Sequence, residues 1–98
     1  DFGARKNFKD ILERLQQEGC PHVILNMEAV TFVDSSALGL LVISHQNLKI
    51  KQAQLTIVSP QAYVRQVLDL ANVPKMIQVL STIEEAKQLS HRSPAGVQ

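Results

Sequence analysis

The chain has 98 residues, the length of one domain, and its composition is 45% hydrophobic and 19% charged. These proportions are typical of a folded globular protein and argue against a disordered tail or a fibrous repeat. Ten Lys and Arg set against nine Asp and Glu leave a net charge of +1, which is too small for the basic surface that nucleic-acid binding requires. We therefore expect a single folded domain and no nucleic-acid partner.

Cysteine usage and hydropathy indicate in which cellular compartment the protein is located. The single cysteine, Cys20, cannot form an internal disulfide, which suits a reducing environment. The longest stretch without a charged residue runs from Ser35 to Leu48, and it is shorter than the roughly 20 apolar residues of a membrane span. The amino terminus is charged and polar, unlike a signal peptide. We expect a cytoplasmic protein, or the cytoplasmic domain of a larger one, with no direct membrane insertion.

The first half of the chain predicts a helix, a strand and a second helix. Apolar residues at helical spacing indicate an amphipathic helix over residues 3–18. Residues 22–27 (HVILNM) are a short apolar run rich in β-branched residues, which is typical of a strand buried on both faces. Asp34, Ser35 and Ser36 are good N-cap residues for a helix that continues through Leu48.

The second half repeats the alternation. Residues 54–58 (QLTIV) predict a strand, and Ser59 and Pro60 are the cap and first-turn residues that a helix start prefers. Asn72 is suited to the left-handed position that ends this helix. A third strand is predicted over residues 77–80.

The end of the chain predicts one more helix and a tail. Residues 81–85 (STIEE) contain two overlapping capping boxes for a helix that extends to about Leu89. Strands that alternate with helices imply crossover connections and a mainly parallel sheet, so the fold class is α/β. We expect one domain over residues 1–90 and a flexible tail over residues 91–98.

Enzyme and metal motifs are missing from the sequence. It contains no G-x-S-x-G, no G-x-x-x-x-G-K, no G-x-G-x-x-G and no H-E-x-x-H. His22, His45 and His91 lie far apart in the sequence, and none is followed by a second ligand three or four residues later, so we expect no metal site and no cofactor. Cys20 has no basic neighbour, which favours a packing role over a reactive thiol.

Residues 31–41 (TFVDSSALGLL) carry the strongest candidate site, because an acid and two serines lead directly into an apolar helix. One interpretation is helix capping, for which Asp and Ser are common. The other is a functional serine. A phosphate on a first-turn serine would meet free backbone N–H groups and the positive end of the helix dipole. The residues by themselves leave both interpretations open.

Residues 22–41 (HVILNMEAVTFVDSSALGLL) resemble the signature of the STAS domain family, most closely its anti-sigma factor antagonist, or anti-anti-sigma, branch. The agreement continues through residues 55–73 (LTIVSPQAYVRQVLDLANV) to residues 81–89 (STIEEAKQL). The resemblance implies a STAS-like mixed, mainly parallel β-sheet covered by about four α-helices. It therefore assigns residues 1–90 to a single STAS domain.

The resemblance also implies a partner-switching mechanism. The first serine after the aspartate, here Ser35, would be phosphorylated by an anti-sigma factor serine kinase and dephosphorylated by a cognate phosphatase. The unphosphorylated protein would bind the kinase and free its sigma factor, and phosphorylation would end the interaction. Asp34 and Ser36 would support the phosphorylation loop, with Asp34 bonded to first-turn amides. The protein would then be a phosphoprotein and not itself an enzyme.

The sequence departs from the family pattern in three places. Ala37 stands where the family most often has Gly, which should favour the helix. Asn26 replaces an acid that is frequent at the end of the preceding strand. Family members usually begin with two further strands, whereas this chain opens at Asp1 near the end of that region. Either strands upstream of Asp1 are missing from this sequence, or the sheet is short and has an uncovered edge, which a homodimer could cover.

Two other functions are alternatives for this motif. STAS domains also occur in transport systems, either at the cytosolic end of a sulfate-type anion transporter or as a subunit of a lipid-transport ATPase, and the signature alone does not separate them from regulators. An enzyme with Asp34 as base and Ser35 as nucleophile is disfavoured. Neither His nor Lys lies near Ser35 in the sequence to take its proton.

The helix predicted after Ser35 has aliphatic residues on two different sides. At 100° per residue, one side packs on the sheet and consists of Ala37, Leu38, Leu41 and Leu48, with His45 among them. A second stripe consists of Ser36, Leu40, Ile43 and Asn47. The stripe is either buried by another part of the domain or is a docking face for the kinase beside Ser35.

Overall fold

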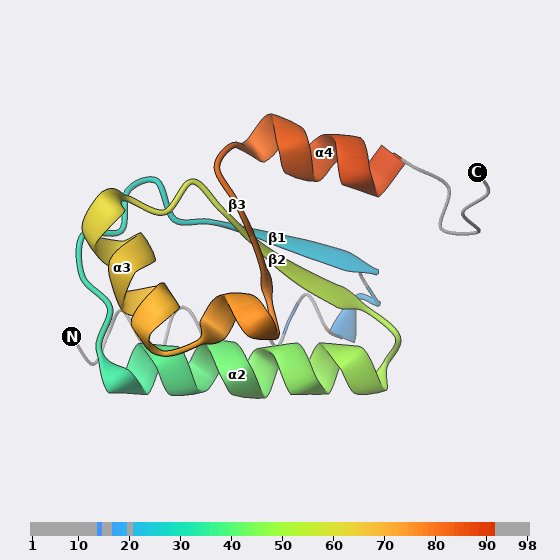
Figure 1. Cartoon of the computed structure of the whole chain (residues 1–98). Coiled ribbons are helices and arrows are strands. Elements are labelled where there is room, and N and C mark those ends of the chain that lie inside the picture. Colours follow the sequence, from blue (N-terminus) through green and yellow to red (C-terminus); the bar gives the residue numbers. More distant parts are fainter. Residues whose placement is uncertain (1–13, 15–16, 20, 92–98) are drawn as a thin grey trace.

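Strands and helices alternate along the chain in the computed structural model, which describes residues 14, 17–19 and 21–91 (Figure 1). The elements in chain order are β1 (His22–Asn26), α2 (Ser35–Ile50), β2 (Gln54–Val58), α3 (Ala62–Leu70), a 3₁₀ turn (Val73–Lys75), β3 (Gln78–Leu80) and α4 (Ile83–His91). This alternation confirms the predicted α/β class.

Two predictions fall mostly outside the described residues. Of the helix expected over residues 3–18, Arg14 and Gln17 are described and both are helical, and the Glu18 N–H donates to the Arg14 carbonyl at 3.0 Å. Residues 3–13, 15 and 16 of that helix lie outside the described residues, as do Cys20 and the tail beyond His91, and Glu18 lies in a turn.

The described strands form one sheet in the order β1-β2-β3. Val23 of β1 is paired with Leu55 of β2, and Ile57 of β2 with Val79 of β3. Both pairings are parallel, so the part of the sheet within residues 21–91 contains no antiparallel pair. β1 lies at one edge of this three-stranded sheet. A homodimer through that edge stays a prediction.

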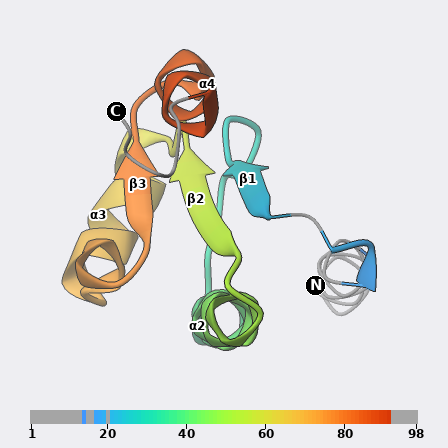
Figure 2. The same cartoon turned by 90° about the vertical axis from the view of Figure 1, so that its right-hand side faces the viewer.

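Helices cover both faces of the sheet, as Figures 1 and 2 show from two directions. α2 and α3 lie on one side, and α4 lies on the other. Because successive strand residues point to opposite faces, Val23 and Leu55 face the α2 side, whereas Thr56 and Val58 face the other. The three layers explain why β2 is almost entirely apolar and buried from Leu55 to Val58.

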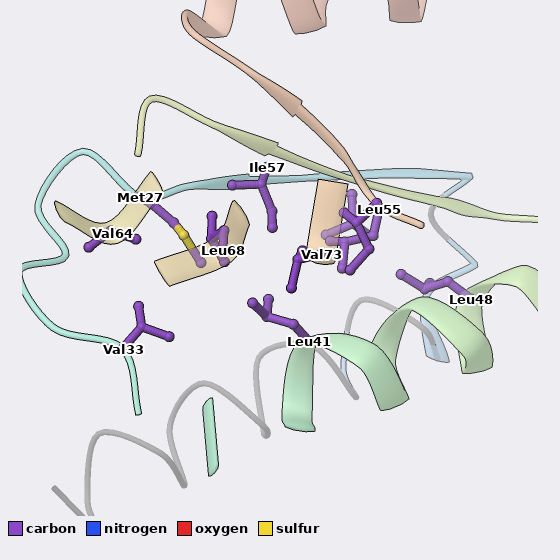
Figure 3. Packing of buried hydrophobic residues seen from close by; sticks show 11 residues of the cluster. Met27, Val33, Leu41, Leu48, Leu55, Ile57, Val64, Leu68 and Val73 are labelled. Carbon is purple, nitrogen blue, oxygen red and sulfur yellow. The ribbon is translucent and has the colours of Figure 1, made fainter. Parts of the chain in front are cut away.

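The main core lies between the sheet and α2 and α3, and it is aliphatic (Figure 3). Met27 and Val33 close it at the carboxyl end of β1, and Val64 and Leu68 contribute from α3. The full cluster is Val23, Met27, Val33, Leu41, Leu48, Leu55, Ile57, Val64, Leu68, Val73 and Ile77. Both aromatic side chains within the described residues are outside it, with Phe32 67% and Tyr63 57% exposed.

The predicted start of α3 is wrong. The helix begins at Ala62 with Gln61 as its N-cap, and neither Ser59 nor Pro60 caps it. Ser59 instead has a positive φ of 58°, and its N–H donates to the carbonyl of Leu80 at 3.0 Å. Ser59 therefore extends the β2–β3 pairing by one residue, and this contact moves the helix start along the chain.

The other element ends agree with the sequence more closely. Asn72 has φ 60°, which confirms the left-handed residue after α3. The capping box of α4 is formed by Thr82 and Glu85: Thr82 Oγ1 accepts from the Glu85 N–H at 3.2 Å, and Glu85 Oε1 accepts from the Thr82 N–H at 3.1 Å. α4 continues to His91, two residues beyond its expected end.

Candidate functional site

The start of α2 holds the predicted site residues together. Asp34 is the N-cap with extended backbone angles, and its Oδ1 accepts a hydrogen bond from the Ala37 N–H at 2.9 Å. The Asp34 carbonyl accepts from the Leu38 N–H at 3.0 Å, which closes the first turn. Asp34 therefore makes the capping contact that the sequence indicates.

Ser35 and Ser36 follow as the first two residues of α2, and both are exposed. No acidic residue lies in the first helical turn, so Asp34 supplies the nearest carboxylate along this part of the chain. A kinase could therefore reach the hydroxyl groups without unfolding α2. Exposure does not separate Ser35 from Ser36, and the choice of Ser35 rests on the resemblance.

The segment before Asp34 is fastened by a turn and by core packing. The Met27 N–H donates to the Val58 carbonyl at 2.9 Å, and the Val30 N–H donates to the Met27 carbonyl at 3.0 Å. Asn26 Oδ1 accepts from the Glu28 N–H at 2.9 Å. Asn26 thus provides a polar contact in this turn although it replaces the acid of the family pattern.

A residue that the sequence did not single out reaches this turn from α3. Gln61 Nε2 donates to the carbonyl of Glu28 at 2.8 Å, across 33 positions of the chain. The β1–α2 connection and the start of α3 lie side by side at this end of the sheet (Figure 1). A glutamine ahead of an amphipathic helix carries no signal of such a contact, because its partner is a backbone atom.

The outer side of α2 is largely exposed and carries both aliphatic and polar residues. Ser36, Ile43 and Asn47 of the predicted stripe are exposed, with Ile43 at 55%, and Leu40 is half-buried. Ile50 continues the stripe by one helical turn and is 81% exposed. The prediction had ended the stripe at Asn47. On the opposite side, Leu41, Ser44 and Leu48 are buried, and His45 is half-buried.

His22 and Thr56 form a polar pair away from Ser35. His22 begins β1, whereas Ser35 follows its far end, and His22 Nε2 is hydrogen-bonded to Thr56 Oγ1 at 2.7 Å. Burial lowers the pKa of His22 below its ordinary value. Thr56 is fully buried, so the contact satisfies a polar group inside the sheet layer.

Within residues 14, 17–19 and 21–91, no three His, Cys, Asp or Glu side chains are grouped so as to hold a metal ion. In the same part of the chain, no helix combines the length and the apolar character that crossing a bilayer requires.

Comparisons with known proteins agree on one family. Residues 1–86 match the family model of the STAS domain. A STAS-domain containing protein of Pseudomonas aeruginosa (strain UCBPP-PA14) is 29% identical over 79 residues, which cover 81% of this chain and 77% of that protein.

Solved structures agree with this match. The crystal structure of a candidate anti-sigma factor antagonist of Thermotoga maritima superposes with a TM-score of 0.80 at 26% identity, over 86% of this chain and 73% of that one. An NMR structure of the same protein, TM1081, gives a TM-score of 0.78 at 26% identity, over 90% of this chain and 71% of that one.

Proposed function

The chain belongs to the STAS domain family, and on that premise we propose that it is an anti-sigma factor antagonist switched by phosphorylation of Ser35. The similarity to the Thermotoga maritima candidate antagonist supports the general class. In this proposal the domain acts by binding and serves as the substrate of a kinase and of a phosphatase, which places it in the cytoplasm with them. It carries out no chemistry of its own.

The observation that carries the proposal is the exposed serine pair at the capped start of α2, next to a helix side that exposes the aliphatic residues Ile43 and Ile50. Ser35 is the first residue of α2, and the stripe of Ser36, Leu40, Ile43 and Asn47 begins one residue later. Exposed apolar patches bordered by polar residues are typical of protein-binding surfaces. A charge added at Ser35 would lie directly beside this surface.

The proposed switch is electrostatic. The kinase transfers the γ-phosphoryl group of ATP to Ser35 Oγ, the hydroxyl proton leaves and ADP is released. The phosphate carries a charge of about −1.5 to −2 at neutral pH. Because it sits at the N-terminus of α2, the helix dipole favours it, and the fold is retained. The same charge must lose water to enter an apolar interface, and it repels carboxylates of the partner, so the complex weakens.

The docking surface in this proposal is the outer stripe of α2. Ile43 supplies most of its accessible aliphatic area between the ends of the helix, and Ile50 extends it. Neither residue contributes to the core cluster, so the fold does not explain their apolar character. A partner that covers them would bury apolar surface that is exposed in the free protein.

Phosphorylation by the purified cognate anti-sigma kinase, followed by peptide mass spectrometry, tests the proposal. We expect one phosphate on Ser35, with labelling abolished in Ser35→Ala and retained in the matched control Ser36→Ala. The phosphorylated protein should lose its affinity for the kinase, and the cognate phosphatase should restore it. A phosphate found on Ser36 or Thr31 would contradict the assignment, and an unlabelled wild-type protein would contradict the function.

A further inference from the structure

The turn between β1 and α2 is held by two side-chain amides that meet at one residue. Asn26 Oδ1 accepts from the Glu28 N–H at 2.9 Å, and Gln61 Nε2 donates to the Glu28 carbonyl at 2.8 Å. Both backbone groups of Glu28 are therefore bonded to side chains. The Asn26 contact is local, whereas the Gln61 contact joins two loops that follow neighbouring strands.

Gln61 occupies the N-cap position of α3, where the side chain usually bonds to the first turn of its own helix. It has extended backbone angles, φ −65° and ψ 159°, yet its side chain makes no capping hydrogen bond. Ser, Thr, Asp and Asn are preferred there because their short side chains reach the free N–H groups of the first turn. The Gln61 amide instead extends away from its own helix to the β1–α2 turn.

The backbone that carries Gln61 is fixed on both sides. Ser59, two residues earlier, has φ 58°; its N–H donates to the Leu80 carbonyl at 3.0 Å, and its Oγ donates to the Ser81 carbonyl at 3.3 Å. The Gln61 carbonyl accepts from the Arg65 N–H at 2.8 Å, which begins α3. A non-glycine residue with positive φ is held there by its surroundings. The amide is thus presented to Glu28 from a rigid frame.

Other contacts also hold the chain from Glu28 to Ser35, and the side chain of Val30 packs against the core. The Val30 N–H closes the turn onto Met27, Val33 is buried in the core, and Asp34 caps α2. Residues 30–34 have no regular secondary structure. The Gln61 bond ties the turn at the start of this segment to the start of α3.

We propose that Gln61 is a positioning residue for Ser35. Its side chain holds the β1–α2 turn, so that the segment from Glu28 to Ser35 is preorganised for the partner. This inference rests on the proposed function. When the hydrogen bond is lost, the turn samples other conformations and only a fraction of molecules presents the loop correctly. The partner's apparent dissociation constant then equals the intrinsic constant divided by that fraction, so binding weakens. The kinase supplies the reacting groups, so turnover of the bound complex stays unchanged.

The test compares three variants. Gln61→Met keeps the length of the side chain but removes the donor, Gln61→Lys restores a donor of similar reach, and Gln66→Met is the matched control at an exposed position of α3. Amide hydrogen exchange of Val30 in the free protein reads the turn directly. Dissociation constants, with KM and kcat for Ser35 phosphorylation by the cognate kinase, read the effect on recognition.

We expect Gln61→Met to speed Val30 exchange and to raise Kd and KM by about 2- to 10-fold, the range for one net hydrogen bond, with kcat unchanged and the melting temperature slightly lowered. Gln61→Lys should recover most of the loss, and Gln66→Met should match wild type. The inference would be overturned if Gln61→Met had the Val30 exchange rate and the KM of the wild type. It would also be overturned if the exchange rate and KM of Gln61→Lys changed as much as those of Gln61→Met. The exchange measurement needs no partner, so it stands even if Ser35 proves not to be a substrate and the proposed function fails.

Discussion

The two sides of α2 have similar chemistry and opposite environments. On the inner side, Leu41 and Leu48 are each 1% exposed and belong to the core cluster. On the outer side, Ile43 and Ile50 are aliphatic too, yet more than half of each side chain is exposed. From Ser35 to Leu48 neither side carries a charged residue. Sequence composition therefore does not distinguish the side that folds the domain from the side left open.

The contrast separates folding from recognition. Burial against the sheet stabilises the fold in proportion to the apolar area removed from water, and only the inner side gains this. The outer side keeps aliphatic residues where a solvent-facing helix would ordinarily carry Lys or Glu. The inner side can therefore be tested by stability and the outer side by binding, and the substitutions below apply those tests in order of decreasing effect on stability.

The largest loss of stability should come from the inner side. Leu41→Ala leaves a cavity between α2 and the sheet, and we expect it to cost about 2–5 kcal/mol of the free energy of unfolding. Its matched control is Ile43→Ala, two residues away on the outer side, which should stay within about 0.5 kcal/mol of wild type. Urea denaturation followed by far-UV circular dichroism measures both. Equal losses in the two variants would show that the two sides do not differ as described.

The start of α2 should contribute less than its inner side. Asp34→Ala removes the bond from Asp34 Oδ1 to the Ala37 N–H, and the lost cap should cost about 0.5–2 kcal/mol. Asp69→Ala is the control, since it breaks only the exposed pair with Arg65 on α3, typically worth about 0.3–0.5 kcal/mol. An unchanged denaturation midpoint in Asp34→Ala would argue against a capping role.

A smaller, pH-dependent effect should come from the other face of the sheet. Burial lowers the pKa of His22 in the folded state, so the unfolded chain binds a proton more readily. Stability should thus be fully present above the ordinary histidine pKa of about 6.5 and should decline as the pH falls from there through the lower folded pKa. The decline should be reduced in His22→Gln and retained in His45→Gln, which leaves His22 in place. Denaturation midpoints between pH 7.5 and about pH 5 provide the measurement. A decline of equal size in His22→Gln would assign the effect to other groups.

The smallest change in stability should accompany the largest change in binding. Ile43→Glu places a charge on the outer side of α2, where it remains solvated in the free protein, so the melting temperature should be nearly unchanged. In the complex the same charge would be buried without a partner, and binding to the kinase should be abolished. Gln88→Glu adds an equal charge at an exposed position of α4, on the opposite face of the sheet, and should bind normally. A variant that unfolds, or one that binds like wild type, would remove the docking role of the stripe.

Local sequence patterns predicted most of this fold. The strand over residues 54–58 was predicted with the bounds that the structure has, because its apolar run has a clear start and end. Asp34, Asn72 and the pair of Thr82 and Glu85 also behave as their residue types indicate. These signals involve residues at most three positions apart, where backbone geometry alone decides the contact.

Contacts between distant segments could not be predicted in this way. Ser59 followed by Pro60 has the pattern of a helix start, but the hydrogen bond from Ser59 to Leu80 takes precedence over it. The Gln61 contact with Glu28 and the His22 contact with Thr56 span 33 and 34 positions. Ile50 was left out of the stripe because the helix was predicted only as far as Leu48, whereas α2 continues to Ile50. Each of these features follows from how the strands are brought together.

The exposed position of Tyr63 determines which changes in the protein can be followed by its intrinsic fluorescence. The chain contains no tryptophan and one tyrosine, so its intrinsic fluorescence comes almost entirely from Tyr63. Tyr63 lies two residues beyond Gln61, and it is 57% exposed in the folded protein. Its emission should therefore change little when the aliphatic core melts. The same emission should respond when another molecule settles over the beginning of α3. Tyr63 emission would thus report binding at the start of α3 but would change little on unfolding.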